Sequence, residues 1–511
     1  MSDTQAKIDK RKEEARAVKK KNQKRASGSI KYTTKKKIRN IAITVVACVL
    51  ALAVIVPNLS FAKRAVTAAR IGDTRISTAE FSYAYISSFY NYYNTMASYV
   101  GQQYIGISTA KSLRKQNMSS TQTYSEYFCN TALQSLQQMI VLSEEAEKNG
   151  FTLSEEQQKE YEDALETMKT TAEKAGLSVD RYLRRMYGQG VNRALYEKML
   201  YRLTLASAYQ EKITNNFEYT QKDLEDYYKE NTKSFDRLTL RSQKFAIVEA
   251  TETAAGVTAE EAKKQAEAFM SKVKDDASFS AAALKLAKEN ASDPDKVTTE
   301  NTLKTDTTYA TIKNANEALA DWALDASRKE GDLALIDGGE KVGYYVAYMI
   351  TPAHREEYNT VDMRHILVSL SSTDAKDETK KAEAKAKAEK LLKEWKDGAA
   401  TEESFAELAD KNSDDKTAGG LYEKVYHDAM VEEVNDWLFN PKRKAGDCEI
   451  VYSENYGYHI IYYVGENVPY WQVRVESTMR NNDYNDFYEK ASENYPVTTS
   501  KFGIWYRNEP F

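Results

Sequence analysis

The chain has 511 residues, enough for about three domains of ~150 residues each. Apolar residues make up 42% and charged residues 29% of it, a balance typical of soluble globular domains. Three cysteines in this length exclude a disulfide framework. The net charge of −4 is distributed unevenly: residues 1–39 hold fifteen of the 72 basic residues and four of the 76 acidic ones, which leaves the remainder at −15.

The basic tail ends directly before the one long apolar run of the sequence, residues 41–56. With its flanks, residues 38–62, this run is long enough to cross a bilayer, which needs ~20 residues. Because Lys and Arg crowd its N-terminal side, the positive-inside rule predicts a cytoplasmic tail (1–38), a single transmembrane helix (39–62) and an extracytoplasmic remainder. The tail is expected to meet anionic lipid head groups, and no nucleic-acid partner is expected.

Two processing alternatives stay open for this segment. Ser60–Ala62 resembles a small-x-small cleavage site, although the apolar run begins late in the chain for a removable signal. Val45–Cys48 resembles a lipobox, which would make Cys48 a lipidated N-terminus, although few apolar residues precede this cysteine. An uncleaved anchor is favoured over both alternatives.

Residues 64–235 predict a helical domain. Proline is absent from this stretch, glycine is sparse, and apolar residues recur at spacings of three and four, as in Leu133, Leu136, Met139 and Ile140. A helical pattern returns near the C-terminus, so residues 470–511 are expected to pack back onto this domain. Tyrosines gather between 83 and 93, where they favour packing between helices over contact with unfolded chains.

The sequence also contains an internal repeat, which predicts two tandem copies of one unit, residues 236–352 and 359–466. Three pairs of segments match in the same order: 265–275 with 387–397, 321–332 with 436–447, and 342–348 with 456–462. Each copy reads as a strand, two helices, a loop, a further helix and a final pair of strands. This order predicts an α+β fold in which helices cover a small antiparallel sheet.

Histidine is scarce, with four in the chain, and two of them lie in the first and last predicted strands of the second copy. His365 belongs to the strand 361–370, and His459 belongs to the strand 457–464. If these strands are neighbours, the two imidazoles meet over one face of the sheet. A lone strand histidine is usually a core residue, but this paired placement makes a functional role equally plausible.

The second copy resembles the parvulin family of peptidyl-prolyl isomerases in an ordered series of motifs. The motifs are Arg364–Val368, Ser404–Ala409, Ser413–Asp415, Gly419–Leu421, Gly446–Asp447 and Tyr456–Ile461. The whole layout, with an anchor, a helical segment, two parvulin-like units and a returning helix, is similar to envelope foldases such as SurA and PrsA.

The resemblance implies two groups of site residues. The hydrogen-bonded catalytic cluster corresponds to His365, Asp415 and His459. The apolar wall that binds the proline ring corresponds to Leu421, Met430, Val434 and Phe439. No cofactor and no metal are implied, because isomerisation of an X-Pro bond breaks no covalent bond; it needs only tighter binding of the twisted amide than of the planar forms.

The second copy also departs from the family pattern. The usual Gly-Gly-Asp-Leu-Gly is here Gly419-Gly420-Leu421-Tyr422, and Val434 stands where a Phe is common, so modest catalysis is expected. The segment 371–380 lacks a cluster of basic residues, which argues against phosphorylated substrates. In the first copy the repeat sets Lys244 opposite His365 and Tyr345 opposite His459, so that copy is expected to keep the fold without the chemistry.

These features together predict a membrane-anchored foldase. It would isomerise X-Pro bonds in unfolded or partly folded exported proteins at the outer face of the cell membrane. The alternatives are a non-catalytic holdase chaperone and an envelope scaffold with a parvulin fold.

Overall fold

The computed structural model describes residues 6–22, 43, 60–101, 104–251, 255–297, 304–371 and 373–511. These residues divide into unit 1, Met1–Phe217 with Asp483–Phe511, and unit 2, Glu218–Asn482. In the basic tail, residues 6–22 are helical. The predicted membrane span, 39–62, lies outside the described residues except for 43 and 60–62. No helix in the described part of the chain combines the length and apolarity needed to cross a bilayer.

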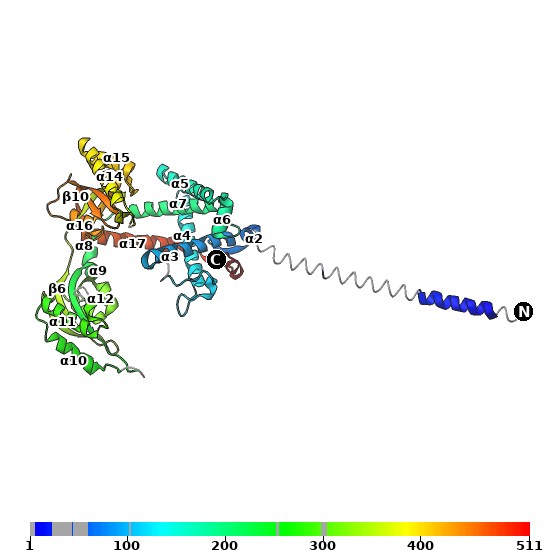
Figure 1. Ribbon diagram of the computed structural model, residues 1–511, viewed down its shortest axis with the longest axis horizontal. Helices are drawn as coiled ribbons and strands as arrows, with labels where there is room; N and C mark the ends of the chain where they lie inside the picture. Colours follow the sequence, from blue (N-terminus) through cyan, green and yellow to red (C-terminus); the bar gives the residue numbers. More distant parts are fainter. Residues whose placement is uncertain are drawn as a thin grey trace. The chain divides into compact units, whose positions relative to one another are not determined.

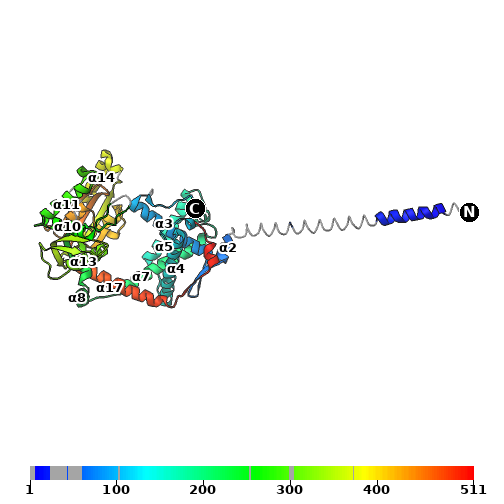
Figure 2. The same cartoon turned by 90° about the horizontal axis from the view of Figure 1, so that it is seen from below.

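Unit 1 consists mainly of helices, several of which begin at capping residues that can be recognised in the sequence. Its helices are α2 (Ser60–Ala65), α3 (Thr78–Val100), η3 (Leu113–Lys115), α4 (Tyr124–Lys148), α5 (Glu155–Lys174), α6 (Val179–Tyr187), α7 (Arg193–Asn215) and α18 (Lys501–Trp505). Ser77 with Glu80, and Thr123 with Glu126, form capping boxes that begin α3 and α4. Figure 2 shows α3, α4 and α7 packed together.

The tyrosines between 83 and 93 pack unit 1 from within. Tyr85 is fully buried and meets Phe128 of α4 edge to face, with ring centroids 6.3 Å apart. Tyr92 contacts the same phenylalanine at 5.5 Å. Offset and edge-on aromatic pairs of this kind stabilise beyond their buried area. The rings therefore hold α3 against α4, which is the packing role that the sequence favoured.

A small sheet joins both ends of the chain in unit 1. It contains β1 (Thr67–Ile71), β2 (Thr74–Ser77) and β11 (Val497–Thr499), in the order β11-β1-β2. The last strand pairs with the first in antiparallel register, and Phe487 lies against Tyr209 of α7. The C-terminal residues thus complete a core that begins more than four hundred positions earlier.

Unit 2 contains two four-stranded antiparallel sheets. The first sheet has β3 (Arg237–Phe245), β4 (Lys304–Thr308), β5 (Leu333–Asp337) and β6 (Tyr344–His354) in the order β4-β3-β6-β5. Alternation along β6 divides its side chains between two layers. Val346 and Tyr348 pack on α10 (Ala259–Met270) and α11 (Asp276–Asn290), whereas Ala347 and Met349 pack on α12 (Tyr309–Ala315) and α13 (Glu317–Ala323).

The second sheet has the same strand order. It contains β7 (Asn359–Ser369), β8 (Leu421–Val425), β9 (Cys448–Ser453) and β10 (Gly457–Pro469) in the order β8-β7-β10-β9. One face, including Ile366 and Ile460, packs on α14 (Glu378–Asp397) and α15 (Glu402–Asn412), which lie beside β10 in Figure 1. The other face packs on α16 (Glu432–Leu438) through Trp437. The fourth strand of each sheet, β4 or β8, was missing from the predicted order of elements.

Five short helices of unit 2 precede its first sheet or connect its longer elements. They are α8 (Gln221–Glu230), α9 (Thr232–Phe235), η4 (Pro294–Lys296), η6 (Asp374–Lys376) and η7 (Ala418–Gly420). Tyr228 and Phe235 form a buried cluster with Trp471 at the start of α17 (Tyr470–Ser492). This cluster gives residues 218–235 and 470–482 to unit 2, whereas the sequence had assigned both stretches to the helical domain.

Candidate active site

The two strand histidines lie on the central pair of strands of the second sheet. His365 of β7 is opposite Ile461, and His459 of β10 is opposite Leu367, so the histidines are diagonal neighbours on one face. Diagonal positions on adjacent strands are within reach of aromatic side chains. The imidazole centroids are 5.0 Å apart and the rings are inclined by only 18°. The sheet therefore gathers the residues that the sequence singled out.

A continuous chain of hydrogen bonds passes through both imidazoles. His365 Nδ1 lies 3.3 Å from Asp415 Oδ2, His365 Nε2 lies 2.9 Å from His459 Nδ1, and His459 Nε2 lies 2.7 Å from Ser453 Oγ. An ionised carboxylate can only accept, so His365 donates through Nδ1 and accepts at Nε2. His459 then donates through Nδ1 and accepts the Ser453 hydroxyl at Nε2. Each neutral ring has a single tautomer that fits this order.

Ser453 is a member of this chain that the sequence analysis missed. It ends β9 opposite Gly457, which is two residues before His459 on β10. The same diagonal relation that joins the histidines therefore brings its hydroxyl to the second ring. The short β9–β10 hairpin was the available signal, since a tight turn places residues on both of its sides in contact.

Burial keeps both imidazoles neutral. Their residues are 8% and 6% exposed, for His365 and His459 respectively. Burial lowers the pKa of His365, partly offset by the nearby Asp415 carboxylate. Burial also lowers the pKa of His459 to about 4, and the neighbouring imidazole adds to this effect. At neutral pH the site presents two uncharged rings beside one carboxylate.

Asp415 accepts several hydrogen bonds besides that of His365. The Tyr422 hydroxyl donates to it at 2.5 Å, and Thr417 donates through its backbone N–H at 3.2 Å and its hydroxyl at 3.0 Å. Burial alone would raise the pKa of Asp415, but these donors outweigh burial and lower it. Thr417 and Tyr422 are therefore further members of the site that the sequence did not predict.

The loop that carries Asp415 is tied to β7 by its two preceding residues. Ser413 Oγ accepts the backbone N–H of Leu367 at 3.0 Å, and the Asp414 backbone N–H donates to the Leu367 carbonyl at 2.9 Å. The Asp414 carboxylate accepts the Ser369 N–H at 2.8 Å. In the Ser-Asp-Asp motif, the first two residues bind β7 by hydrogen bonds, and this places the third residue, Asp415, beside His365.

A pair of glycines lets the next loop approach β7 closely. Gly419 and Gly420 both have a left-handed backbone, with φ of +55° and +62°. A Cβ on Gly420 would lie 2.2 Å from the His365 carbonyl oxygen. No side chain fits at that distance, so the close contact that leads the chain into β8 requires glycine.

A cavity of about 400 Å³ opens beside the histidines. It is lined by Met363, His365, Leu367, Asp415, Tyr422, Ala429, Met430, Val431, Val434, Tyr456 and His459. Apolar side chains form one wall, and the hydrogen-bonded row forms the other. Five of the seven predicted site residues therefore border one space.

The other two predicted wall residues, Leu421 and Phe439, do not line this cavity. Side chains alternate along a strand, and Tyr422 is the β8 residue that faces the histidines, so Leu421 faces away. Phe439 follows the end of α16 and stacks on His427, with ring centroids 3.8 Å apart. The structure thus places these two residues outside the cavity lining, and their contact with a proline ring stays a prediction.

The first sheet differs at the positions equivalent to the histidines. Gly343 packs against Ala246 as Gly457 packs opposite Ser369. Counting back four residues from Ala246 and from Ser369 places Ser242, not Lys244, at the position of His365. The alignment of the first strands was therefore offset by two residues: Lys244 lies opposite Tyr345 as Leu367 lies opposite His459, so Lys244 matches Leu367.

One comparison with known proteins covers the residues of this site. Residues 347–466 match the family model described as a PPIC-type PPIASE domain. This part of the chain is a parvulin-type peptidyl-prolyl isomerase domain. The isomerase domain accounts for the second sheet and every residue of the hydrogen-bonded row.

Solved structures give distant likenesses over longer stretches. The foldase protein PrsA of Streptococcus pneumoniae is 15% identical, with 44% of this chain and 70% of that chain covered and a TM-score of 0.22. A SurA-like chaperone of Campylobacter jejuni is 10% identical, with coverages of 85% and 99% and a TM-score of 0.21. Scores this low carry no argument about how the whole chain is arranged. Among curated proteins, no sequence match is found.

The lowered histidine pKa values predict that the isomerase domain loses stability in mild acid. The unfolded chain takes up protons near pH 6.5, whereas His459 resists protonation down to about pH 4, so stability falls as pH drops through this interval. For His459 the full loss is about 3–4 kcal/mol, from about 2.5 pKa units at ~1.4 kcal/mol per unit. Hydrogen exchange of β10 peptides between pH 7 and pH 4.5 measures it. His459→Asn should flatten the dependence, and equal protection of the wild type at both values would contradict it.

Removing the tyrosine hydroxyl from Asp415 should shift the pH dependence of catalysis. Tyr422→Phe keeps the ring on the cavity wall but deletes the 2.5 Å donor, so the pKa of Asp415 rises. The acid limb of kcat/KM then moves to higher pH, with a modest loss at neutrality. Tyr456→Phe is the matched control, since that phenol borders the same cavity and its acid limb should stay in place. Identical profiles for the two variants would rule out a role for the Tyr422 hydroxyl.

Proposed function

We propose that this chain is a membrane-anchored, extracytoplasmic foldase that isomerises X-Pro bonds in exported proteins. The observation that carries the proposal is the convergence of His365, His459 and Asp415 beside an open cavity with an apolar wall. That arrangement offers a place for a pyrrolidine ring next to fixed polar groups. Both features are needed to bind a prolyl peptide in its twisted form.

The chemistry follows from the two walls of the cavity. The barrier to rotation of a peptide bond is ~18–20 kcal/mol, and twisting removes the resonance of the amide. Met430 and Val434 can hold the proline ring in a water-poor setting, while the hydrogen-bonded row holds the backbone beside it. Each factor of ten in rate needs only about 1.4 kcal/mol of tighter binding to the twisted form than to the planar forms. The neutral histidines serve by position and hydrogen bonding, with no proton to transfer.

The anchor and the orientation rest on the sequence. The basic residues before position 39 and the apolar run that follows support a single span with the isomerase domain outside. Newly exported chains are unfolded where they emerge, so an isomerase tethered at that face meets its substrates early. Unfolded and partly folded exported proteins are the substrates we propose.

The first sheet supports a second, non-catalytic parvulin-like unit over residues 236–352. It shares the strand order of the isomerase domain, but Ser242 and Tyr345 occupy the positions of the two histidines. No hydrogen-bonded imidazole pair can form with these residues. We assign this unit to client binding or spacing.

A proline-limited refolding assay with the full chain in detergent tests the proposal. The wild type should accelerate the slow phase, and Met430→Ala should reduce kcat/KM by on the order of tenfold by removing ring contacts worth about 1–2 kcal/mol. Met270→Ala, a substitution in the other parvulin-like unit, should leave the rate unchanged. If the wild type and Met430→Ala are equally slow while aggregation of clients is still suppressed, the chain is a holdase instead.

A further inference from the structure

The C-terminal helix of unit 1 exposes two large aromatic rings. In α18, Phe502 is 58% exposed and Trp505 is 62% exposed. The opposite side of the helix is fixed, because a Cβ on Gly503 would lie 2.0 Å from the Thr67 carbonyl oxygen of β1. The helix is therefore held rigidly with its aromatic side outward.

Basic residues lie on the two chain segments that meet at Trp505. Lys501 precedes them in α18, and the segment before α4 adds Lys111, Arg114 and Lys115. The Arg114 guanidinium donates to the Trp505 carbonyl at 2.7 Å and lies over the indole ring. We call this set, with Phe502 and Trp505, the α18 surface. It is basic although the chain beyond the N-terminal tail is acidic overall.

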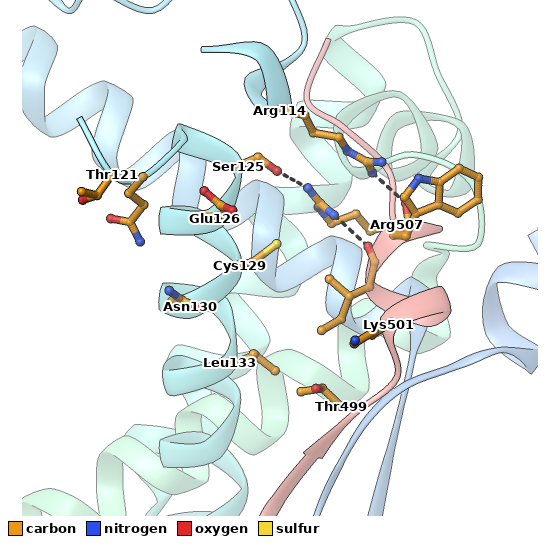
Figure 3. Close-up of a pocket in the computed structure, with 13 residues that line it drawn as sticks. Arg114, Thr121, Ser125, Glu126, Cys129, Asn130, Leu133, Thr499, Lys501 and Arg507 are labelled. Carbon is orange, nitrogen blue, oxygen red and sulfur yellow. Dashed lines mark hydrogen bonds between the residues drawn. The ribbon is translucent and has the colours of Figure 1, made fainter. Parts of the chain in front are cut away.

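A cavity of about 1020 Å³ lies beside the α18 surface. Figure 3 shows Arg114, Lys501 and Arg507 around it, with Glu126 on the α4 side. Of the carboxylates nearby, Glu509 is shared by Arg114 and Arg507, at 2.8 Å and 3.1 Å. Glu126 accepts from Thr123 in the capping box of α4. Both acids already have partners, so Lys501 has no carboxylate partner among the contacts around this cavity.

The α18 surface lies next to the point where the described chain begins after the predicted anchor. Helix α2 starts at Ser60, two residues before the predicted span ends. Its Lys63 ammonium donates to the carbonyl of Tyr506, the residue after Trp505, and lies 3.8 Å above the Tyr506 ring. Phe61 of α2 is itself 57% exposed. The Lys63 side chain thus connects the residue that follows the predicted span to the base of the α18 surface.

We infer that the α18 surface docks unit 1 on the anionic outer face of the bilayer. Tryptophan and other amphipathic aromatics favour the level of the lipid head groups, and clustered Lys and Arg attract anionic lipids by about 1 kcal/mol per residue. The inference rests on the anchor in the proposed function, which holds α2 at that face. A short tether supplies a high effective concentration, so even a weak surface contact is occupied.

Lipid quenching of Trp505 tests the inference. The full chain is reconstituted in vesicles of equal parts phosphatidylcholine and phosphatidylglycerol, with or without bromine in the upper acyl chains. The chain has five tryptophans, so contact by Trp505 alone should quench up to about a fifth of the emission, as the ring lies at head-group depth. Trp505→Phe should lose this quenched fraction. Trp322→Phe, which removes a half-buried indole from unit 2, should retain it.

The same experiment also tests the contribution of the basic residues. Lys501→Glu combined with Lys115→Glu should lower the quenched fraction at least twofold, and phosphatidylcholine vesicles should do the same to the wild type. An alkaline wash first shows whether the chain stays with the vesicles. A chain that washes off overturns both the anchor and this inference. If the chain stays anchored but Trp505 is not quenched, the inference fails while the anchor stands. The same conclusion holds if the emission of Trp505 responds instead to an added acidic polypeptide.

Discussion

Gly420→Ala should lower kcat/KM of the isomerase domain by about 100-fold while leaving unit 1 folded. The new methyl group would lie 2.2 Å from the His365 carbonyl oxygen and 3.0 Å from its backbone nitrogen, so either β7 or the glycine loop must move. A left-handed backbone adds about 1–2 kcal/mol for any residue with a Cβ. Displacement of a catalytic group by about 1 Å is enough for a loss of this size.

Gly446→Ala is the matched control for that substitution. Gly446 also belongs to the isomerase domain and has a φ of +91°, but a Cβ there meets nothing within 4 Å. The control carries the same backbone strain, about 1–2 kcal/mol, without the collision. Its kcat/KM should stay within a few-fold of the wild type. Equal losses in the two variants would show that strain, rather than the approach to His365, explains the first result.

His459→Ala should both inactivate the isomerase domain and destabilise it by several kcal/mol. The substitution leaves His365 Nε2 and Ser453 Oγ without their partner in a buried setting. Each unsatisfied buried polar group costs about 1–3 kcal/mol. His365→Ala should also destabilise the domain, because it leaves His459 Nδ1 without its partner, whereas Asp415 keeps its bonds from Thr417 and Tyr422.

The double variant His365→Ala/His459→Ala should cost less than the sum of the two single ones. Each single substitution leaves the nitrogen of the remaining ring without a hydrogen-bond partner, and the double variant removes both nitrogens. The free energies of unfolding should therefore differ from additivity by about 1–2 kcal/mol. Exchange protection of β7 and β10 peptides in the full chain measures these energies locally. Strictly additive values would mean that the 2.9 Å contact between the rings contributes nothing to stability.

The sequence pointed to the residues of the hydrogen-bonded row through local patterns and a family resemblance. His365 and His459 lie in strongly apolar strands, and the first and last strands of a small sheet are neighbours here, so their contact followed from strand order. The histidine contact needs only the identity of the elements and the alternation of side chains. Asp415 came from the resemblance of Ser413–Asp415 to the parvulin motif, and the structure shows this segment tied to β7.

The wall of the cavity could not be derived in the same way. Whether Leu421 or Tyr422 faces the histidines depends on the pairing of β8 with β7, where Tyr422 is opposite Met363. That register depends on the close approach of the left-handed turn at Gly419 and Gly420 to β7. This approach is a tertiary contact, which the sequence does not reveal. The strands β4 and β8 were missed because both are only five residues long and β4, Lys304–Thr308, consists of polar residues.

The sheet of unit 1 has a consequence for how the chain folds during synthesis. Strand β1 needs Val497–Thr499 as its partner, but the ribosome delivers these residues only after all of unit 2 has emerged. Domains fold as units while translation continues, so the isomerase domain can be native and active while β1 still has an open edge. Unit 1, although its first residues are translated before unit 2, therefore completes its sheet last. A nascent foldase would carry a working prolyl isomerase next to its own unfinished half.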